Sequence, residues 1–285
     1  MEKIILYYKF VPVTDPDMTM RWQRELCERL GLKGRVIIAK HGINGTLGGE
    51  LKNVKSYVKA MNLTEQFKKI QYKWSDGSAE DFPRLSIKVR DELVTLAPGE
   101  SFDVLNSTKG LKPKAWHKYL EDHPDAIVLD ARNDFESDIG AFKGKNVVKP
   151  QIKNFRDIKP ELDKLPKDQP ILTYCTGDIR CEYLSAYMKH KGFGEVYHLD
   201  GGIVKYGEQY KDDGHWEGKC FVFDKRLSVA FSDDYKDIGD CSHCQSKTSE
   251  HVNCANLACN QFILLCENCD EQIYCSDCVK LLVNN

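Results

Sequence analysis

Residues 170–188 read Pro170-Ile-Leu-Thr-Tyr-Cys175-Thr-Gly-Asp-Ile-Arg180-Cys181-Glu-Tyr-Leu-Ser-Ala-Tyr-Met188, a pattern that predicts a short buried strand, a six-residue loop and a helix. A cysteine opens the loop and an arginine closes it. We therefore expect Cys175 where backbone N–H groups converge at a helix N-terminus, a position that stabilises an anion. A thiolate there has a lowered pKa and is a usable nucleophile. Gly177 and Arg180 add anion-binding chemistry that an inert buried cysteine would lack.

The length and composition are those of an ordinary globular protein. The chain has 285 residues, which is typical of two domains with room for a third, small one. It is 41% hydrophobic and 29% charged with a net charge of -2, which neither supports nor excludes a nucleic-acid partner. No apolar run is long enough to cross a bilayer, and the apolar part of the N-terminus is too short for a secretory signal. We therefore expect a cytoplasmic protein that does not bind membranes.

Strand and helix signals alternate in the first part of the chain. Asp15 or Asp17 can cap a helix that runs through Leu30 and ends at Gly31. The order β-α-β-β-α-β predicts a small ferredoxin-like (acylphosphatase-like) α+β domain in residues 1–96, a fold that by itself does not indicate a function. The other predicted elements are strands at Ile4–Val11, Arg35–Lys40, Ile70–Trp74 and Leu85–Val89, a hairpin-like continuation at His41–Gly49, and a helix at Leu51–Met61.

The central part of the chain, residues 110–212, has the pattern of an α/β domain. Its strands alternate with helices, which implies a parallel sheet with helices on both faces. In such sheets ligands bind at the carboxyl ends of the strands, which is where Cys175 falls. The predicted strands are Ala126–Asp130, Asn146–Val148, Ile171–Tyr174 and Val196–Leu199, and the predicted helices are Ala115–Leu120, Ile158–Leu165 and Cys181–Lys191. Residues 211–240 show little periodicity and are predicted to be a connecting arm.

Cysteines are concentrated at the end of the chain. Eight of the 12 lie between Cys241 and Cys278, which in a long chain without a secretory signal favours metal over disulfides. The chain from residue 213 to 285 is therefore predicted to be an arm followed by a Cys-rich region with two structural four-thiolate zinc sites. The pairs are Cys241–Cys244, Cys254–Cys259, Cys266–Cys269 and Cys275–Cys278. They combine either in order or with the first joining the third and the second the fourth. Disulfides or free thiols are the alternative to metal. His243 and His251 are candidate substitute ligands for the metal, but the eight cysteines already suffice.

Two residues near the loop have alternative interpretations. Cys181 falls in the first turn of the predicted helix, where it is either a resolving thiol for Cys175 or a small packed residue. Arg132, with Asp130 and Glu136, follows a strand whose carboxyl end faces the same crevice. It either contacts the substrate or forms a structural salt bridge.

The central segment resembles a rhodanese domain, and the whole chain resembles the rhodanese-type tRNA uridine hydroxylases. The rhodanese resemblance rests on Asp130-Ala-Arg132, Gly140-Ala-Phe-Lys-Gly144, Tyr174-Cys175-Thr-Gly-Asp-Ile-Arg180 and His198-Leu-Asp-Gly-Gly-Ile203. The wider resemblance adds Tyr7-Tyr-Lys-Phe10 and Lys40-His-Gly-Ile-Asn-Gly-Thr46 in the N-terminal domain, and Val252-Asn-Cys-Ala-Asn256 with the later cysteines in the tail. The joint occurrence of three such stretches is much more specific than any one of them.

The resemblance implies an oxidation that depends on a cysteine. The family converts the wobble uridine of tRNA to 5-hydroxyuridine with molecular oxygen, so the implied partner is the anticodon region of tRNA. By the match, Cys175 is the catalytic residue and passes through a persulfide, as rhodanese cysteines do. Arg180 closes the loop and stabilises negative charge on Cys175 or its adduct. The implied active-site loop also contains Thr176, Gly177, Asp178, Ile179 and Cys181.

The loop departs from the family pattern at one position. The family often has Cys-Thr-Gly-Gly-Ile-Arg, whereas this chain has Asp178 at the fourth place. If the position needs a positive φ, Asp tolerates it better than most residues other than glycine. Its negative charge disfavours a neighbouring thiolate unless the carboxylate points into solvent.

Basic residues with interleaved aromatics in the N-terminal domain are the candidates for RNA contact. Phosphate contacts combined with base stacking are typical of proteins that hold single-stranded RNA loops, while a solvated charged face is the alternative. Lys40, His41 and Arg84, with Arg132 of the central domain, are the substrate-binding candidates. The full set is Lys33, Arg35, Lys40, His41, Lys68, Lys69, Lys73, Arg84, Lys88 and Arg90, with Tyr7, Tyr8, Tyr72 and Trp74 between them.

Three other functions compete with tRNA hydroxylation. One is a sulfurtransferase that moves sulfane sulfur through a Cys175 persulfide. A phosphatase is disfavoured, because phosphatases of related fold have a longer loop between the cysteine and the arginine. A zinc-dependent interaction module with a vestigial rhodanese domain is disfavoured by the intact loop from Cys175 to Arg180.

Overall fold

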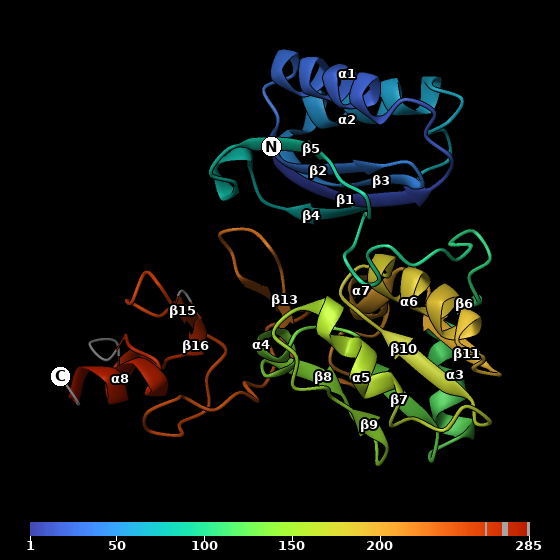
Figure 1. Cartoon of the computed structure of the whole chain (residues 1–285). Coiled ribbons are helices and arrows are strands. Elements are labelled where there is room, and N and C mark those ends of the chain that lie inside the picture. Colours follow the sequence, from blue (N-terminus) through green and yellow to red (C-terminus); the bar gives the residue numbers. More distant parts are fainter. Residues whose placement is uncertain (260, 270–272, 284–285) are drawn as a thin grey trace.

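The protein is described by a computed structural model that covers residues 1–259, 261–269 and 273–283 (Figure 1). An N-terminal α+β layer lies against a central α/β domain, with one sheet face turned toward the helices and strands below it (Figure 1). The Cys-rich tail packs beside the central domain. Among the described residues, no helix is both long enough and apolar enough to span a lipid bilayer.

The N-terminal domain is ferredoxin-like, as predicted, and its sheet has five strands in the order β4-β1-β3-β2-β5. The Asp15 carboxylate caps the first helix by accepting from the Met18 N–H at 2.8 Å. A fifth strand, parallel to β2, extends the four-stranded ferredoxin-like arrangement at one edge. The elements are β1 (Glu2–Phe10), α1 (Pro16–Arg29), β2 (Lys33–Ala39), β3 (Gly42–Glu50), α2 (Leu51–Leu63), β4 (Tyr72–Asp76), η1 (Ala79–Asp81) and β5 (Leu85–Val89).

The two faces of this sheet have different roles. Alternate residues of a strand point to opposite faces, so Ile5 and Tyr7 are buried under the helices, in the apolar core of the domain. Leu6 and Tyr8 point the other way and line a cavity above the central domain. The face without helices is therefore the one that positions the site.

The central domain is the predicted parallel α/β sheet, with strand order β6-β11-β10-β7-β9. Ile171 of β10 packs into one apolar cluster and the next residue, Leu172, packs into another, so helices cover both faces. The elements are β6 (Lys109–Leu111), α3 (Pro113–Asp122), β7 (Ile127–Asp130), α4 (Asp134–Ser137), β8 (Gly140–Phe142), β9 (Val147–Val148), η2 (Phe155–Ile158), α5 (Lys159–Leu162), β10 (Ile171–Tyr174), α6 (Ile179–His190), β11 (Val196–Leu199) and α7 (Gly202–Tyr210).

The connecting arm has more structure than its lack of periodicity predicts. β12 (Trp216–Gly218) pairs with β8, and β13 (Cys220–Phe221) pairs with β14 (Ser228–Val229). Strands of two or three residues are too short to give a recognisable alternation of polar and apolar residues. The turn between β13 and β14 reaches the N-terminal domain, where the Lys225 N–H donates to the Asp81 carbonyl at 3.0 Å.

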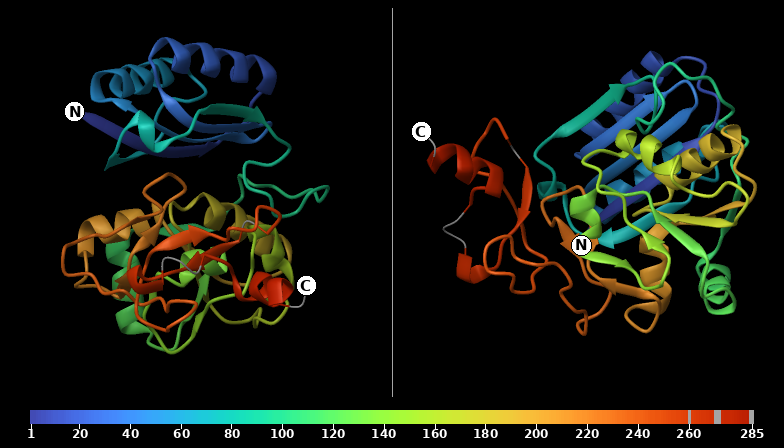
Figure 2. Two further views of the ribbon diagram at one scale, coloured as in Figure 1. Left: turned by 90° about the vertical axis from the view of Figure 1, so that its left-hand side faces the viewer. Right: turned by 60° about the horizontal axis from the view of Figure 1, so that its bottom comes forward.

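The tail is small and packs on the central domain beside α4 (Figure 2). It contains β15 (His251–Asn253), β16 (Phe262–Leu264), η3 (Glu267–Cys269) and α8 (Ser276–Val283). Leu264 joins Ile139 and Phe221 in one apolar cluster, and His251 Nε2 is 3.0 Å from the Phe135 carbonyl oxygen. His251 is therefore a packing residue rather than the substitute metal ligand that the sequence left open.

Candidate active site

The loop that begins with Cys175 connects β10 to α6, as predicted. Asp178 occupies the N-cap of α6 with a φ of 84°, and its backbone N–H lies 3.2 Å from the Cys175 sulfur. This N–H donates to the thiolate and stabilises it. Gly177 packs against the N-terminal sheet, because a Cβ added there would lie 2.7 Å from the Leu6 Cδ2 atom and the Leu6 side chain would have to shift. The loop is thus shaped by both domains.

The Cys175 thiol is buried and acidic. Burial by itself would raise its pKa, but the hydrogen bond with Cys181 and the positive charge of Arg180 together lower the pKa to about 6. Burial and the neighbouring Cys175 raise the pKa of Cys181, which also accepts from the Thr173 hydroxyl at 3.2 Å. At neutral pH, Cys175 is therefore a thiolate and Cys181 a neutral thiol beside it.

Arg180 makes a two-point ion pair with Glu136. Its guanidinium donates to the two carboxylate oxygens at 2.6 and 2.7 Å, and the Glu136 side chain is completely buried. Thr176 adds a third contact, with its hydroxyl 3.3 Å from the carboxylate. The pair fixes the guanidinium while leaving its charge close enough to act on Cys175.

Asp178 does not point into solvent, contrary to the condition expected for a reactive thiol. Its carboxylate is buried, 2.7 Å from His198 Nδ1, and accepts from the Gly201 N–H at 3.2 Å and from the Tyr8 hydroxyl at 3.0 Å. Burial opposes a charge on His198, but the Asp178 carboxylate outweighs this effect and raises the pKa of His198 to about 9. A protonated histidine therefore balances the charge that aspartate brings into the loop.

Arg132 is a structural residue, and its prediction as a substrate contact is wrong. The side chain is fully buried and pairs with Asp130 through contacts of 2.6 and 2.9 Å. It also donates to the carbonyl oxygens of Glu136 and Gly140. Because the guanidinium donates to these acceptors inside the domain, it is not available in the crevice.

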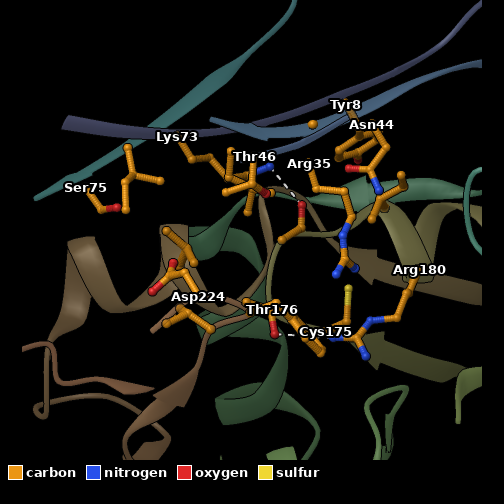
Figure 3. A pocket seen from close by; sticks show the side chains of 18 of the residues that line it. Tyr8, Arg35, Asn44, Thr46, Lys73, Ser75, Cys175, Thr176, Arg180 and Asp224 are labelled. Atoms are coloured by element: carbon orange, nitrogen blue, oxygen red, sulfur yellow. Dashed lines mark hydrogen bonds between the residues drawn. The ribbon is translucent and has the colours of Figure 1, made fainter. Parts of the chain in front are cut away.

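A cavity of about 870 Å³ separates the open face of the N-terminal sheet from the Cys175 loop. Figure 3 shows the Cys175 sulfur pointing into this space, with the Arg35 guanidinium directed toward it from above. The Arg35 side chain makes no hydrogen bond or ion pair with any residue in the described part of the chain. A volume of this size suits a ligand as large as a nucleotide. The polar lining from the sheet is Tyr8, Arg35, Asn44, Thr46, Lys73, Ser75 and Asp76.

The connecting arm also lines the cavity, which the sequence analysis missed. Phe223, Asp224 and Arg226 lie on its wall. The Arg226 guanidinium pairs with Asp224 at 2.6 Å and donates to the Asp76 carbonyl at 2.6 Å, which joins the arm to the N-terminal domain. The signal was the aromatic and charged run at 221–226, inside a stretch otherwise assigned only to a linker.

Of the candidate RNA contacts, Tyr8, Arg35, Lys73 and Trp74 line the cavity. Tyr7 is a core residue hydrogen-bonded to Tyr57, and Tyr72 packs against the same core, so both predictions are wrong. His41 is half-buried near Phe10 and Tyr183 at the contact between the domains, so RNA contact by it stays a prediction. Lys40 and Arg84 are exposed outside the cavity, so RNA contact by them stays a prediction.

Known protein families match this chain over nearly its whole length. Residues 2–93 match a UPF0176 acylphosphatase like domain, residues 113–209 a rhodanese-like domain, and residues 217–280 a rhodanase C-terminal domain. A protein of Corynebacterium urealyticum named tRNA uridine(34) hydroxylase is 48% identical, with 97% of this chain and 96% of that protein covered. The chain belongs to the tRNA uridine(34) hydroxylase family. Relatives of the same name from Arthrobacter sp. and Corynebacterium glutamicum are 49% identical (94% of each chain covered) and 45% identical (98% of this chain, 92% of the relative).

The tail of this tRNA uridine(34) hydroxylase family member contains two groups of four cysteines. One consists of Cys241, Cys244, Cys266 and Cys269, and the other of Cys254, Cys259, Cys275 and Cys278. The first pair therefore joins the third and the second joins the fourth. All sulfurs of a group lie within 4.8 Å of one another, which fits the S–S edge of about 3.8 Å in a tetrahedron with metal–sulfur bonds of about 2.3 Å. Each group can hold one metal ion.

The acidity of Cys175 gives a testable pH profile for this tRNA uridine(34) hydroxylase family member. Because only the thiolate is alkylated, we expect Cys175 to react with iodoacetamide with a midpoint near pH 6 and to slow below it. Burial raises the pKa of Cys220 to about 12, so that thiol should stay unreactive over the same range. Peptide mass spectrometry distinguishes the two sites. A Cys175 midpoint near that of a free cysteine, about 8.5, would contradict this account.

Proposed function

We propose that this protein hydroxylates the wobble uridine of tRNA at C5 with molecular oxygen, and that Cys175 is the catalytic thiol. The observation that carries the proposal is an activated thiol facing a cavity between domains, in a chain nearly half identical over its length to proteins named tRNA uridine(34) hydroxylase. Such an activity operates in the cytoplasm, where tRNA is found. Rhodanese-like domains also occur without this activity, so the fold alone does not indicate the substrate. The similarity to proteins named tRNA uridine(34) hydroxylase supports tRNA as the substrate.

The cavity is suited to a base turned out of the anticodon loop. Bases of a single-stranded loop can be splayed out and inserted into a pocket at low cost, because they have no pairing partner to lose. The Arg35 guanidinium lies above the Cys175 sulfur, and this guanidinium is free to bind a phosphate or an oxygen of the base. Phe223 on the arm provides an exposed ring on which a base can stack. The wobble nucleotide would thus lie between the sheet, the arm and the loop.

The chemistry sets requirements for the residues around the base. Insertion of one atom of O₂ into the C5–H bond leaves the other to be reduced to water, which takes two electrons and two protons from a donor. The Cys175 thiolate is the nucleophile nearest to the cavity, in a loop whose N–H groups and Arg180 charge stabilise negative charge. We infer that the chemistry uses this thiolate or its persulfide.

A sulfurtransferase is the alternative, and the acidic Cys175 beside the neutral Cys181 favours it as a second candidate. The two functions differ in what tRNA gains. Nucleoside mass spectrometry of tRNA from a bacterial host without 5-hydroxyuridine, complemented with this chain, should detect 5-hydroxyuridine at the wobble position. Complemented cells without this nucleoside would contradict hydroxylation, and a thiolated nucleoside in its place would support sulfur transfer.

We infer that the two cysteine groups hold zinc, because four thiolates without an open position are typical of structural zinc sites. Metal analysis of the purified protein should find about two zinc ions per chain. Cys241→Ser should lower this value to about one, because it disrupts one group and leaves the other intact. Cys27→Ser, in the N-terminal core, should not change it. Loss of both zinc ions in Cys241→Ser would contradict two independent groups.

A further inference from the structure

A second cavity of about 400 Å³ lies beside the Cys175 loop, where Asp178 lines its wall. Charged groups from both domains meet at its wall. Lys73 and Tyr8 come from the N-terminal sheet, while Asp178, Glu182 and His198 come from the central domain. The Tyr8 hydroxyl donates to Asp178 at 3.0 Å and lies 2.7 Å from Glu182. No step of the proposed reaction uses this cluster.

Lys73 is an unusual residue for a strand of an RNA-contacting sheet, because it is only 5% exposed. Its ammonium donates to the Gly177 carbonyl at 2.8 Å and lies 5.1 Å from the centre of the Tyr8 ring (Figure 3). Gly177 is the loop residue between Thr176 and Asp178, so Lys73 holds the segment whose N–H groups face the thiolate. The prediction of a phosphate contact at this position is therefore wrong.

Burial lowers the pKa of Lys73 below its ordinary value, and the nearby anions Asp178, Cys175 and Asp200 act in the opposite direction. His198 already pairs with Asp178, and Arg180 already pairs with Glu136. Among the described residues, Lys73 has no carboxylate within ion-pair distance, unlike His198 and Arg180. The Cys175 thiolate is one of the anions that interact electrostatically with Lys73.

We propose that Lys73 and Tyr8 are positioning residues of the thiol centre, so that the docked N-terminal domain sets the reactivity of Cys175. Lys73 holds the Gly177 carbonyl and supplies positive charge, and Tyr8 holds the Asp178 carboxylate. This rests on the proposed function only in giving Cys175 a role, because the reactivity of the thiol can be measured without tRNA.

Lys73→Met tests the proposal, with Lys33→Met as the matched control. Lys33 is also on the N-terminal sheet, but it pairs with Glu80 on the surface. In the full chain, Lys73→Met should move the midpoint of Cys175 alkylation upward by about one pH unit, while Lys33→Met should not move it. Lys73→Arg, which keeps the charge, should stay close to the unmodified protein. A folded Lys73→Met protein with an unchanged midpoint would overturn the proposal, as would an equal shift in Lys33→Met.

A second pair of variants tests the charge balance without changing the N-terminal domain. The charged groups around His198 are Asp178, Glu182 and the neighbouring Asp200, with the Thr108 carbonyl at Nε2. His198→Asn leaves Asp178 without its cation, so the Cys175 midpoint should rise. The double variant Asp178→Asn/His198→Asn removes both charges, so the midpoint should return toward its original value. If His198→Asn left the Cys175 midpoint unchanged, the Asp178 charge would not act on the thiol. His198 would then have no charge of Asp178 to balance at the thiol.

Discussion

Cys175→Ser is expected to lower the rate of wobble-uridine hydroxylation by about a thousandfold or more, a loss typical of removing a catalytic nucleophile. Serine fits the space and keeps a polar atom for the Asp178 N–H, so the loop should keep its shape. It cannot form an anion at neutral pH or carry sulfur, which removes the function of the loop. The measurement is a time course of 5-hydroxyuridine formation in tRNA, in an extract of the hydroxylase-free host supplied with purified protein.

Cys27→Ser is the control for this experiment. Cys27 is also a buried cysteine, but it lies on α1 in the core of the N-terminal domain, and burial raises its pKa to about 12. Its replacement should leave the rate nearly unchanged. A Cys175→Ser protein as fast as Cys27→Ser would mean that the thiol is not part of the reaction.

Glu136→Ala is expected to destabilise the central domain by about 3–5 kcal/mol, because it leaves the buried Arg180 guanidinium without its partner. The carboxylate also accepts from the Asn133 N–H and the Thr176 hydroxyl, and both contacts would be lost. Denaturant unfolding of the two proteins, followed by tryptophan fluorescence, measures the difference. Trp116 and Trp216 are buried in the same domain and report on its unfolding.

Asp122→Ala is the control, because it removes an ion pair that is exposed to solvent instead of a buried one. Asp122 pairs with Lys118 on exposed helix α3, where solvent screens the charges. This substitution should change the stability only slightly. If Glu136→Ala were equally mild, the Arg180–Glu136 pair would not be a structural element of the loop.

The fold was predictable where short apolar runs end at turn residues. The strands Leu85–Val89, Ile171–Tyr174 and Val196–Leu199 have the predicted bounds, since glycine, proline or charged residues flank each run. The sequence raised a positive φ at Asp178 only as a condition that aspartate tolerates, and the structure shows a φ of 84° there. Local geometry follows from local sequence, so these features could be derived without any tertiary contact.

The partners of the loop residues could not be predicted, because each lies far along the chain. Glu136 is 44 residues from Arg180, and Tyr8 is 170 residues from Asp178. The grouping of the tail cysteines has the same origin, since both pairings satisfy the spacing and only the fold of the tail separates them. Arg132 was instead predicted to contact the substrate, but its guanidinium is used in hydrogen bonds to Asp130 and to the Gly140 carbonyl inside the domain.

Isotope labelling with ¹⁸O₂ tests the central claim most directly. The host without 5-hydroxyuridine, complemented with this chain or with Cys175→Ala, would be grown under labelled oxygen, and its tRNA nucleosides analysed by mass spectrometry. The account predicts 5-hydroxyuridine carrying one ¹⁸O atom at the wobble position with the unmodified chain, and none with Cys175→Ala. Unlabelled 5-hydroxyuridine, or labelled nucleoside formed without Cys175, would contradict it.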